Sequence, residues 1–68
     1  MNKANTRELS KALAWLSVNN DSAIACRTLA TIYRCGTSAD QRAILAIIVA
    51  RGLSRKFYTE NNCLMAIG

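Results

Sequence analysis

The side chains of this sequence best suited to chemistry are its basic residues, because they outnumber the acids by more than two to one. Nine Lys and Arg residues against four Asp and Glu residues leave a formal charge of +5 on 68 residues. Such a surplus favours contact with phosphate groups or with acidic protein surfaces. The plainer interpretation of any one basic group is a solvated surface that keeps a small apolar protein soluble.

Three groups of basic residues emerge when the sequence is placed on helices. The first lies on one side of a helix and comprises Arg27, Thr31 and Arg34, bordered by the apolar Ile24. The second comprises Arg51, Arg55 and Lys56. The third is a row that comprises Lys3, Arg7 and Lys11. We expect the first two groups, together with Trp15, to contact a partner.

The acids predict no catalytic centre. The sequence has no histidine, the side chain that most often acts as a general base near neutral pH, and its glycines are isolated. The four acids are Glu8, Asp21, Asp40 and Glu60. Each falls at or within the first turn of a predicted helix, where a carboxylate stabilises free backbone N–H groups. We therefore expect a protein that is not an enzyme.

The three cysteines predict neither a zinc site nor a disulfide framework. Cys26, Cys35 and Cys63 are odd in number and lack C-x-x-C spacing. We interpret them as small buried apolar residues, with Cys35 after Arg34 as the one candidate for a reactive thiol. No metal and no cofactor are expected.

The longest apolar run, residues 43–50, is too short for the ~20 residues of a membrane span, and with no signal segment a cytoplasmic protein is expected.

The elements that position these residues are predicted to be helices. Proline is absent and alanine and leucine are frequent, which favours helix throughout. Residues 1–68 are predicted to form a single all-α domain, a bundle of three to four short helices with five as the upper limit. The predicted starts are the capping pair Asn5–Glu8, then Asp21 or Ser22, then the capping pair Ser38–Gln41. The predicted stops are Asn19 or Asn20, then Gly36, then Gly52.

The third helix, about residues 39–51, is predicted to be central, because residues 43–50 are apolar on every side. It would be surrounded by its own chain or by a second copy. A β-strand over the same residues is the rival, disfavoured by their alanine content. The C-terminal segment is either one helix from Ser54 or a shorter final helix from Thr59 after a turn, and we favour the two-piece arrangement. The second helix is predicted to bury Ala23, Cys26, Leu29, Ala30 and Tyr33.

A protein partner accounts for more of the sequence than any other function. Apolar residues make up 51% of the chain, more than one small bundle easily hides, and the remainder would form an interface. Trp15, Ile24 and Ile32 lie at the edges of their predicted apolar stripes, and Trp and Arg are enriched at interfaces. We expect a regulator that binds and modulates another protein with an acidic surface, of the inhibitor type common among phage- and plasmid-encoded proteins of this size. A homodimer is a further expectation from the apolar excess.

DNA binding is the alternative. The second helix, the turn at residues 35–38 and the third helix have the outline of a helix-turn-helix. Gln41 and Arg42 would then read base edges from the start of the third helix, or Arg27 and Arg34 would contact DNA from the second. Asp40 and the apolar run that follows it count against the third helix in that role.

Overall fold

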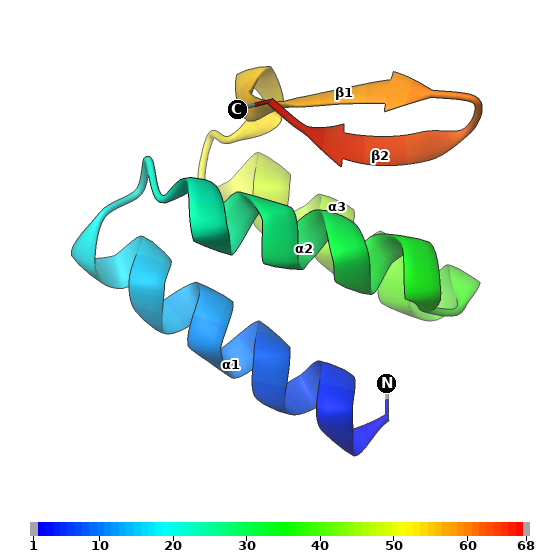
Figure 1. Ribbon diagram of the computed structural model, residues 1–68, viewed down its shortest axis with the longest axis horizontal. Coiled ribbons are helices and arrows are strands. Elements are labelled where there is room, and N and C mark those ends of the chain that lie inside the picture. The colour runs from blue at the N-terminus through cyan, green and yellow to red at the C-terminus, as the bar shows by residue number, and fades with distance from the viewer. Residues whose placement is uncertain (1, 68) are drawn as a thin grey trace.

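A computed structural model describes residues 2–67 as three α-helices followed by a short 3-10 turn and a β-hairpin (Figure 1). The elements are α1 (Lys3–Val18), α2 (Ala23–Cys35), α3 (Ser38–Ala50), η1 (Ser54–Lys56), β1 (Phe57–Glu60) and β2 (Cys63–Ala66). The prediction of a mostly helical chain is confirmed. The all-α class is wrong, because the last segment is a two-stranded antiparallel sheet. Residues 1 and 68, the ends of the predicted domain, lie outside the described residues.

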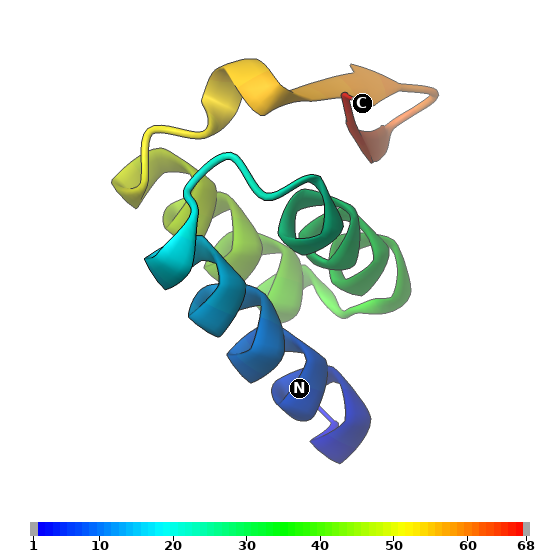
Figure 2. The same ribbon diagram turned by 60° about the vertical axis from the view of Figure 1, so that its left-hand side comes forward.

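α2 is the central element of the fold. It packs against α1, against α3 and against β2. Figures 1 and 2 show α1 and the hairpin on opposite sides of α2, with α3 behind it in the view of Figure 1. The core residues that α2 contributes are Ala25, Cys26, Leu29, Ala30 and Ile32. The sequence prediction was right for three of these positions, while Tyr33 is half-buried and Ala23, the first residue of the helix, is exposed.

The prediction that α3 is the central helix is wrong. Ile44 and Ile48 are buried against the rest of the chain, whereas Leu45 and Val49 are exposed. The reason is that the hairpin packs mainly on α2. α3 therefore lies at the periphery and carries an uncovered apolar face.

The first helix begins earlier than its predicted capping pair. The Asn2 side chain accepts the backbone N–H of Asn5 at 2.7 Å and caps α1. Asn5 and Glu8 consequently lie within the helix, because a capping side chain is already available three residues upstream. The cap of α2 is Ser22, one of the two predicted residues.

The start of the third helix is displaced by one residue from its prediction. The capping box is formed by Thr37 and Asp40, not by Ser38 and Gln41. Thr37 Oγ1 accepts the Asp40 N–H at 3.3 Å, and Asp40 Oδ2 accepts the Thr37 N–H at 3.0 Å. The predicted stops are confirmed: Gly36 ends α2, and Gly52, with a φ of 67°, follows α3.

The predicted C-terminal helix is replaced by a hairpin. Asn61 and Asn62 both have positive φ, 52° and 64°, as a two-residue turn that matches the twist of the strands requires. The register pairs Phe57 with Ala66 and Glu60 with Cys63. Because successive side chains of a strand point to opposite faces, Phe57 is buried and Tyr58 is exposed. Leu64 on β2 joins Phe57 in the core.

Candidate functional site

One side of α2 is left uncovered and carries the first predicted basic group. Ile24, Arg27, Thr31 and Arg34 are spaced by three, four and three residues, so they share one side of the helix. All four are exposed, Ile24 to 60%. These four residues are termed the α2 ridge. The prediction that they lie together on the solvent side of the second helix is confirmed.

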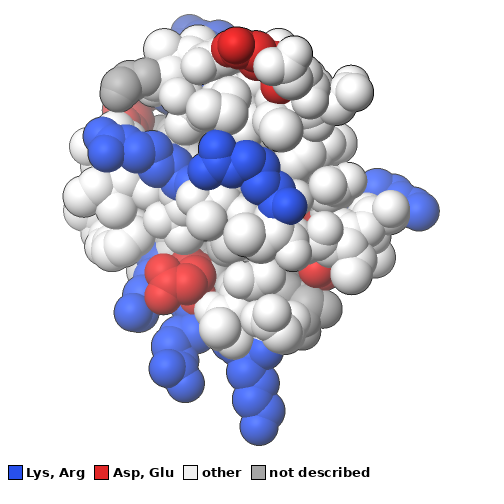
Figure 3. Space-filling view, turned by 45° about the vertical axis from the view of Figure 1, so that its right-hand side comes forward, with Lys and Arg blue, Asp and Glu red and all other residues white. Residues whose placement is uncertain are grey.

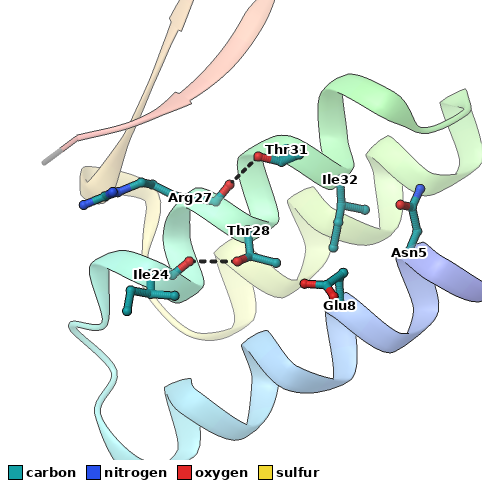
Figure 4. Close-up of a pocket in the computed structure, with 7 residues that line it drawn as sticks. All are labelled: Asn5, Glu8, Ile24, Arg27, Thr28, Thr31 and Ile32. Carbon is teal, nitrogen blue, oxygen red and sulfur yellow. Dashed lines mark hydrogen bonds between the residues drawn. The ribbon is translucent and has the colours of Figure 1, made fainter.

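A first groove of about 400 Å³ lies between α1 and the α2 ridge. Its lining residues are Asn5, Glu8, Ile24, Arg27, Thr28, Thr31 and Ile32. Figure 4 shows Thr28 and Ile32 pointing from α2 toward α1, from which Glu8 and Asn5 point back. Thr28 Oγ1 donates to the Ile24 carbonyl and Thr31 Oγ1 to the Arg27 carbonyl, both at 2.9 Å. Because these hydroxyl protons are used within the helix, the α2 wall offers a ligand apolar contact at Ile24 and a guanidinium at Arg27.

A second groove of about 230 Å³ lies on the other side of the α2 ridge, against the hairpin. Its lining residues are Arg27, Ala30, Thr31, Arg34, Met65 and Ala66. Arg34 Nη1 donates to Met65 Sδ at 3.3 Å, which holds the guanidinium beside β2. A thioether is a weak acceptor and a guanidinium has five N–H donors, so most of the hydrogen-bonding capacity of Arg34 is unused.

The two ridge arginines carry uncompensated charge. Among residues 2–67, neither Arg27 nor Arg34 has a carboxylate partner. Glu8, the acid that lines the first groove, is paired with Lys11 at 3.6 Å. Figure 3 shows the basic side chains of one face in separate groups with uncharged surface between them. The second groove is therefore the more cationic of the two and the first groove the more apolar.

Trp15 is 40% exposed but is not among the residues that line the first groove. It follows Glu8 by two helical turns, so the two side chains leave α1 on nearly the same side. Ile32 is a correction: it was predicted at an exposed stripe edge, but it is only 2% exposed and belongs to the core. Ile32 faces α1, which shields its side chain from solvent, so it contributes only the floor of the first groove.

The second predicted basic group does not join the α2 ridge. Lys56 Nζ lies 2.7 Å from Asp21 Oδ1, and this hydrogen bond, together with the charge of Lys56, holds the pKa of the Asp21 carboxyl below its usual value. The half-buried Arg51 follows α3, and its carbonyl accepts a hydrogen bond from Asn20 Nδ2 at 3.2 Å. Arg55 lines a separate small pocket with Lys56 and Ile67. These residues line no pocket in common with the α2 ridge.

The residues of the nucleic-acid alternative are differently placed. Gln41 is half-buried, and its Nε2 donates to the Tyr33 carbonyl at 3.2 Å, which commits the side chain to the α2–α3 turn. Arg42 is exposed. Asp40 is buried in its capping box, where the hydrogen bond from the Thr37 backbone N–H holds the pKa of the carboxyl below its usual value.

The remaining acids are distributed differently from the prediction. Glu8 lies inside α1 and Glu60 ends β1, so neither is in the first turn of a helix.

The cysteines are also distributed differently from the prediction. Cys26 is buried, and burial raises the pKa of its thiol. Cys35 and Cys63 are exposed free thiols, contrary to the prediction that all three are buried, because one ends a helix and the other borders the hairpin turn.

Several residues of the two grooves were not recognised in the sequence. Asn5 and Glu8 were assigned to a helix cap, and Thr28 lies between two predicted faces. Met65 and Ala66 reach the second groove only because β2 packs on α2, and no local pattern indicates such a contact.

Comparisons with known proteins identify no relative: no protein-family model, no curated protein and no solved structure matches the chain. Within residues 2–67, no helix is long and apolar enough to cross a membrane. In the same part of the chain, no group of three or more His, Cys, Asp or Glu side chains is placed to hold a metal ion. The α2 ridge and its two grooves form the candidate site.

Proposed function

We propose that this chain is a small non-enzymatic regulator that modulates another protein by holding an acidic, amphipathic segment of it on the α2 ridge. The observation that carries the proposal is the asymmetry of the two grooves. The first groove offers apolar contact at Ile24 above a floor formed by Ile32, whereas Arg34 lines only the second groove and Arg27 lines both. Neither arginine has a carboxylate partner among residues 2–67.

The distance between Arg27 and Arg34 predicts the spacing of the acidic residues in the partner segment. Arg27 and Arg34 are seven residues apart, which is about 10.5 Å along a helix axis. Two carboxylates match this distance when they lie seven residues apart on a helix or three apart on an extended strand. Each pairs with a guanidinium through charge-assisted hydrogen bonds.

The apolar side of the segment occupies the first groove. A volume of about 400 Å³ accommodates one or two large side chains beside Ile24. The Glu8 carboxylate repels an acid in the first groove. Binding of the segment in the reversed orientation, with its acids in the first groove and its apolar side in the second, is therefore disfavoured.

Selection from a display library of random 12-residue peptides on the immobilised protein tests this proposal. We expect the selected sequences to combine Asp or Glu with Leu, Ile, Phe or Trp, and to lose at least tenfold in affinity for the Ile24→Asp variant. Val18→Asp, which replaces another exposed apolar side chain by an acid at the end of α1, should retain binding apart from a small general electrostatic loss. Selected peptides without acids, or peptides that bind both variants equally, contradict the proposal.

A second candidate, DNA binding, is favoured by the two-residue turn between α2 and α3 and by the exposed Arg42. The engagement of Gln41 with Tyr33 and the apolar face beyond Arg42 count against it. Fluorescence anisotropy of a labelled mixed-sequence duplex near physiological salt separates the two functions. Micromolar binding that weakens steeply with salt, with a slope lowered by about two when Arg27 and Arg34 are both replaced by Ala, would favour DNA.

A further inference from the structure

We propose that the exposed face of α3 is a self-association surface, on which a second copy of this chain docks with its own α3 antiparallel. The face is apolar from residue 43 to residue 50, with Leu45 41% exposed and Val49 70% exposed. The exposed alanines beside them are Ala39, Ala43, Ala46 and Ala50. This surface is distinct from the α2 ridge and takes a different partner.

Charge selects a second copy as the occupant. The chain carries +5, so two copies repel each other wherever their basic groups meet. The one charge on the exposed side of α3 is Arg42, near its N-terminal end. Beyond Arg42 the face offers only apolar side chains, so it has little to attract the acidic segment expected at the α2 ridge, whereas an identical apolar face complements it by two-fold symmetry.

The antiparallel direction follows from Arg42. When the two-fold axis passes near Ala46, Arg42 of each copy lies opposite Ala50 of the other, because both are four residues from the axis. The C-terminal end of a helix carries a partial negative charge, which attracts the guanidinium and offsets the repulsion from the half-buried Arg51 that follows Ala50. A parallel pair would instead bring the two Arg42 side chains together. The exposed alanines allow the helix axes to approach to about 8 Å, the lower end of the usual range.

The available area predicts a weak dimer. α3 is about 20 Å long and about 10 Å wide, whereas a standard interface covers roughly 800 Å² on each partner. That standard area is about a fifth of the 4441 Å² surface of the chain. One helix face alone falls short of it, so we expect a dissociation constant between about 1 µM and about 1 mM.

Sedimentation equilibrium measures the association. The apparent mass should rise from 7.4 kDa toward twice that value as the protein concentration is raised through the range of the expected dissociation constant. Added salt should leave the association unchanged or strengthen it, because it screens the repulsion between the copies. Val49→Arg should weaken association at least tenfold. The matched control is Val18→Arg at the end of α1, where the side chain is 90% exposed, and it should associate like the wild type apart from a small loss to the added charge.

Disulfide trapping tests the direction in a Cys35→Ser, Cys63→Ser background. Ala46→Cys should cross-link two copies under mild oxidation, since residues at the two-fold axis meet and a disulfide needs Cα atoms within about 7 Å. Ala39→Cys, on the same side and two turns away, should not cross-link. A wild type that stays monomeric to about 1 mM, equal losses at Val49 and Val18, or cross-linking at both alanine positions would overturn the proposal.

Discussion

Lys56 Nζ and Asp21 Oδ1 lie 2.7 Å apart and tie the loop between α1 and α2 to the turn that leads into the hairpin. This contact helps to set the position of β2, and with it the second groove. Because Lys56 lowers the pKa of the Asp21 carboxyl in the folded chain, the stabilisation is present above the ordinary pKa of about 4. It is lost as the pH falls through the lowered, folded-state value.

Asp21→Asn is therefore expected to lower the urea midpoint slightly at about pH 6 and to leave it unchanged at about pH 2. Circular dichroism at 222 nm follows the unfolding. Replacing Lys56 by Gln in the Asp21→Asn background should add no further pH dependence. An effect of Asp21→Asn that is equal at the two pH values would show that the ion pair does not contribute.

Ile32 and Ile24 should respond oppositely to truncation, because Ile32 is buried and Ile24 is exposed. Ile32→Ala removes core packing and should lower the free energy of unfolding by about 2–5 kcal/mol. Ile24→Ala should change it by less than about 0.5 kcal/mol. Urea denaturation measures both, and a comparable loss at Ile24 would place that side chain in the core and remove it from the docking surface.

Thr37, and not Ser38, is expected to control the start of α3. Thr37→Ala removes the oxygen that accepts the Asp40 N–H and should cost about 1 kcal/mol in the free energy of unfolding. Ser38→Ala should have little effect, because Ser38 is the first helical residue and its side chain caps nothing. Thermal unfolding of the two variants measures the difference, and the reverse order would restore the capping pair expected from the sequence.

Asn62 is expected to tolerate glycine better than alanine. Its φ of 64° is in the left-handed region, which costs an alanine about 1–2 kcal/mol and glycine almost nothing. Asn62→Ala should lower the thermal midpoint, whereas Asn62→Gly, which gives the Asn-Gly turn typical of hairpins, should keep or raise it. Equal midpoints for the two variants would contradict this turn geometry.

Local patterns in the sequence predicted the helices well and their surroundings poorly. The exposed side of α2 followed from the spacing of Arg27, Thr31 and Arg34, because helical periodicity alone assigns residues to opposite sides. The peripheral position of α3 could not be predicted in this way. Its apolar run indicates that the helix should be buried on several sides, but it does not indicate whether the rest of this chain buries it. The hairpin was missed because its strands have four residues each and Thr59 also suits a helix cap.

The candidate site likewise has a part that could be predicted from local sequence patterns and a part that could not. The α2 ridge was predictable from one helix, whereas both grooves depend on which elements pack beside it. Met65 enters the second groove through a tertiary contact with Arg34. Lys56 was predicted to contact a partner but is paired with Asp21, thirty-five positions earlier in the sequence, and such a pair has no local signal.

Titration of the ¹⁵N-labelled protein with a selected acidic peptide, followed by backbone amide shifts, tests the central claim most directly. We predict that the largest shifts occur between Ile24 and Arg34 and at Met65, and that added salt weakens the binding. Arg27→Gln should weaken it further, by about tenfold for the loss of one charge-assisted contact. Shifts concentrated at Leu45 and Val49 instead, with no response to salt, would contradict the assignment of the docking surface to the α2 ridge.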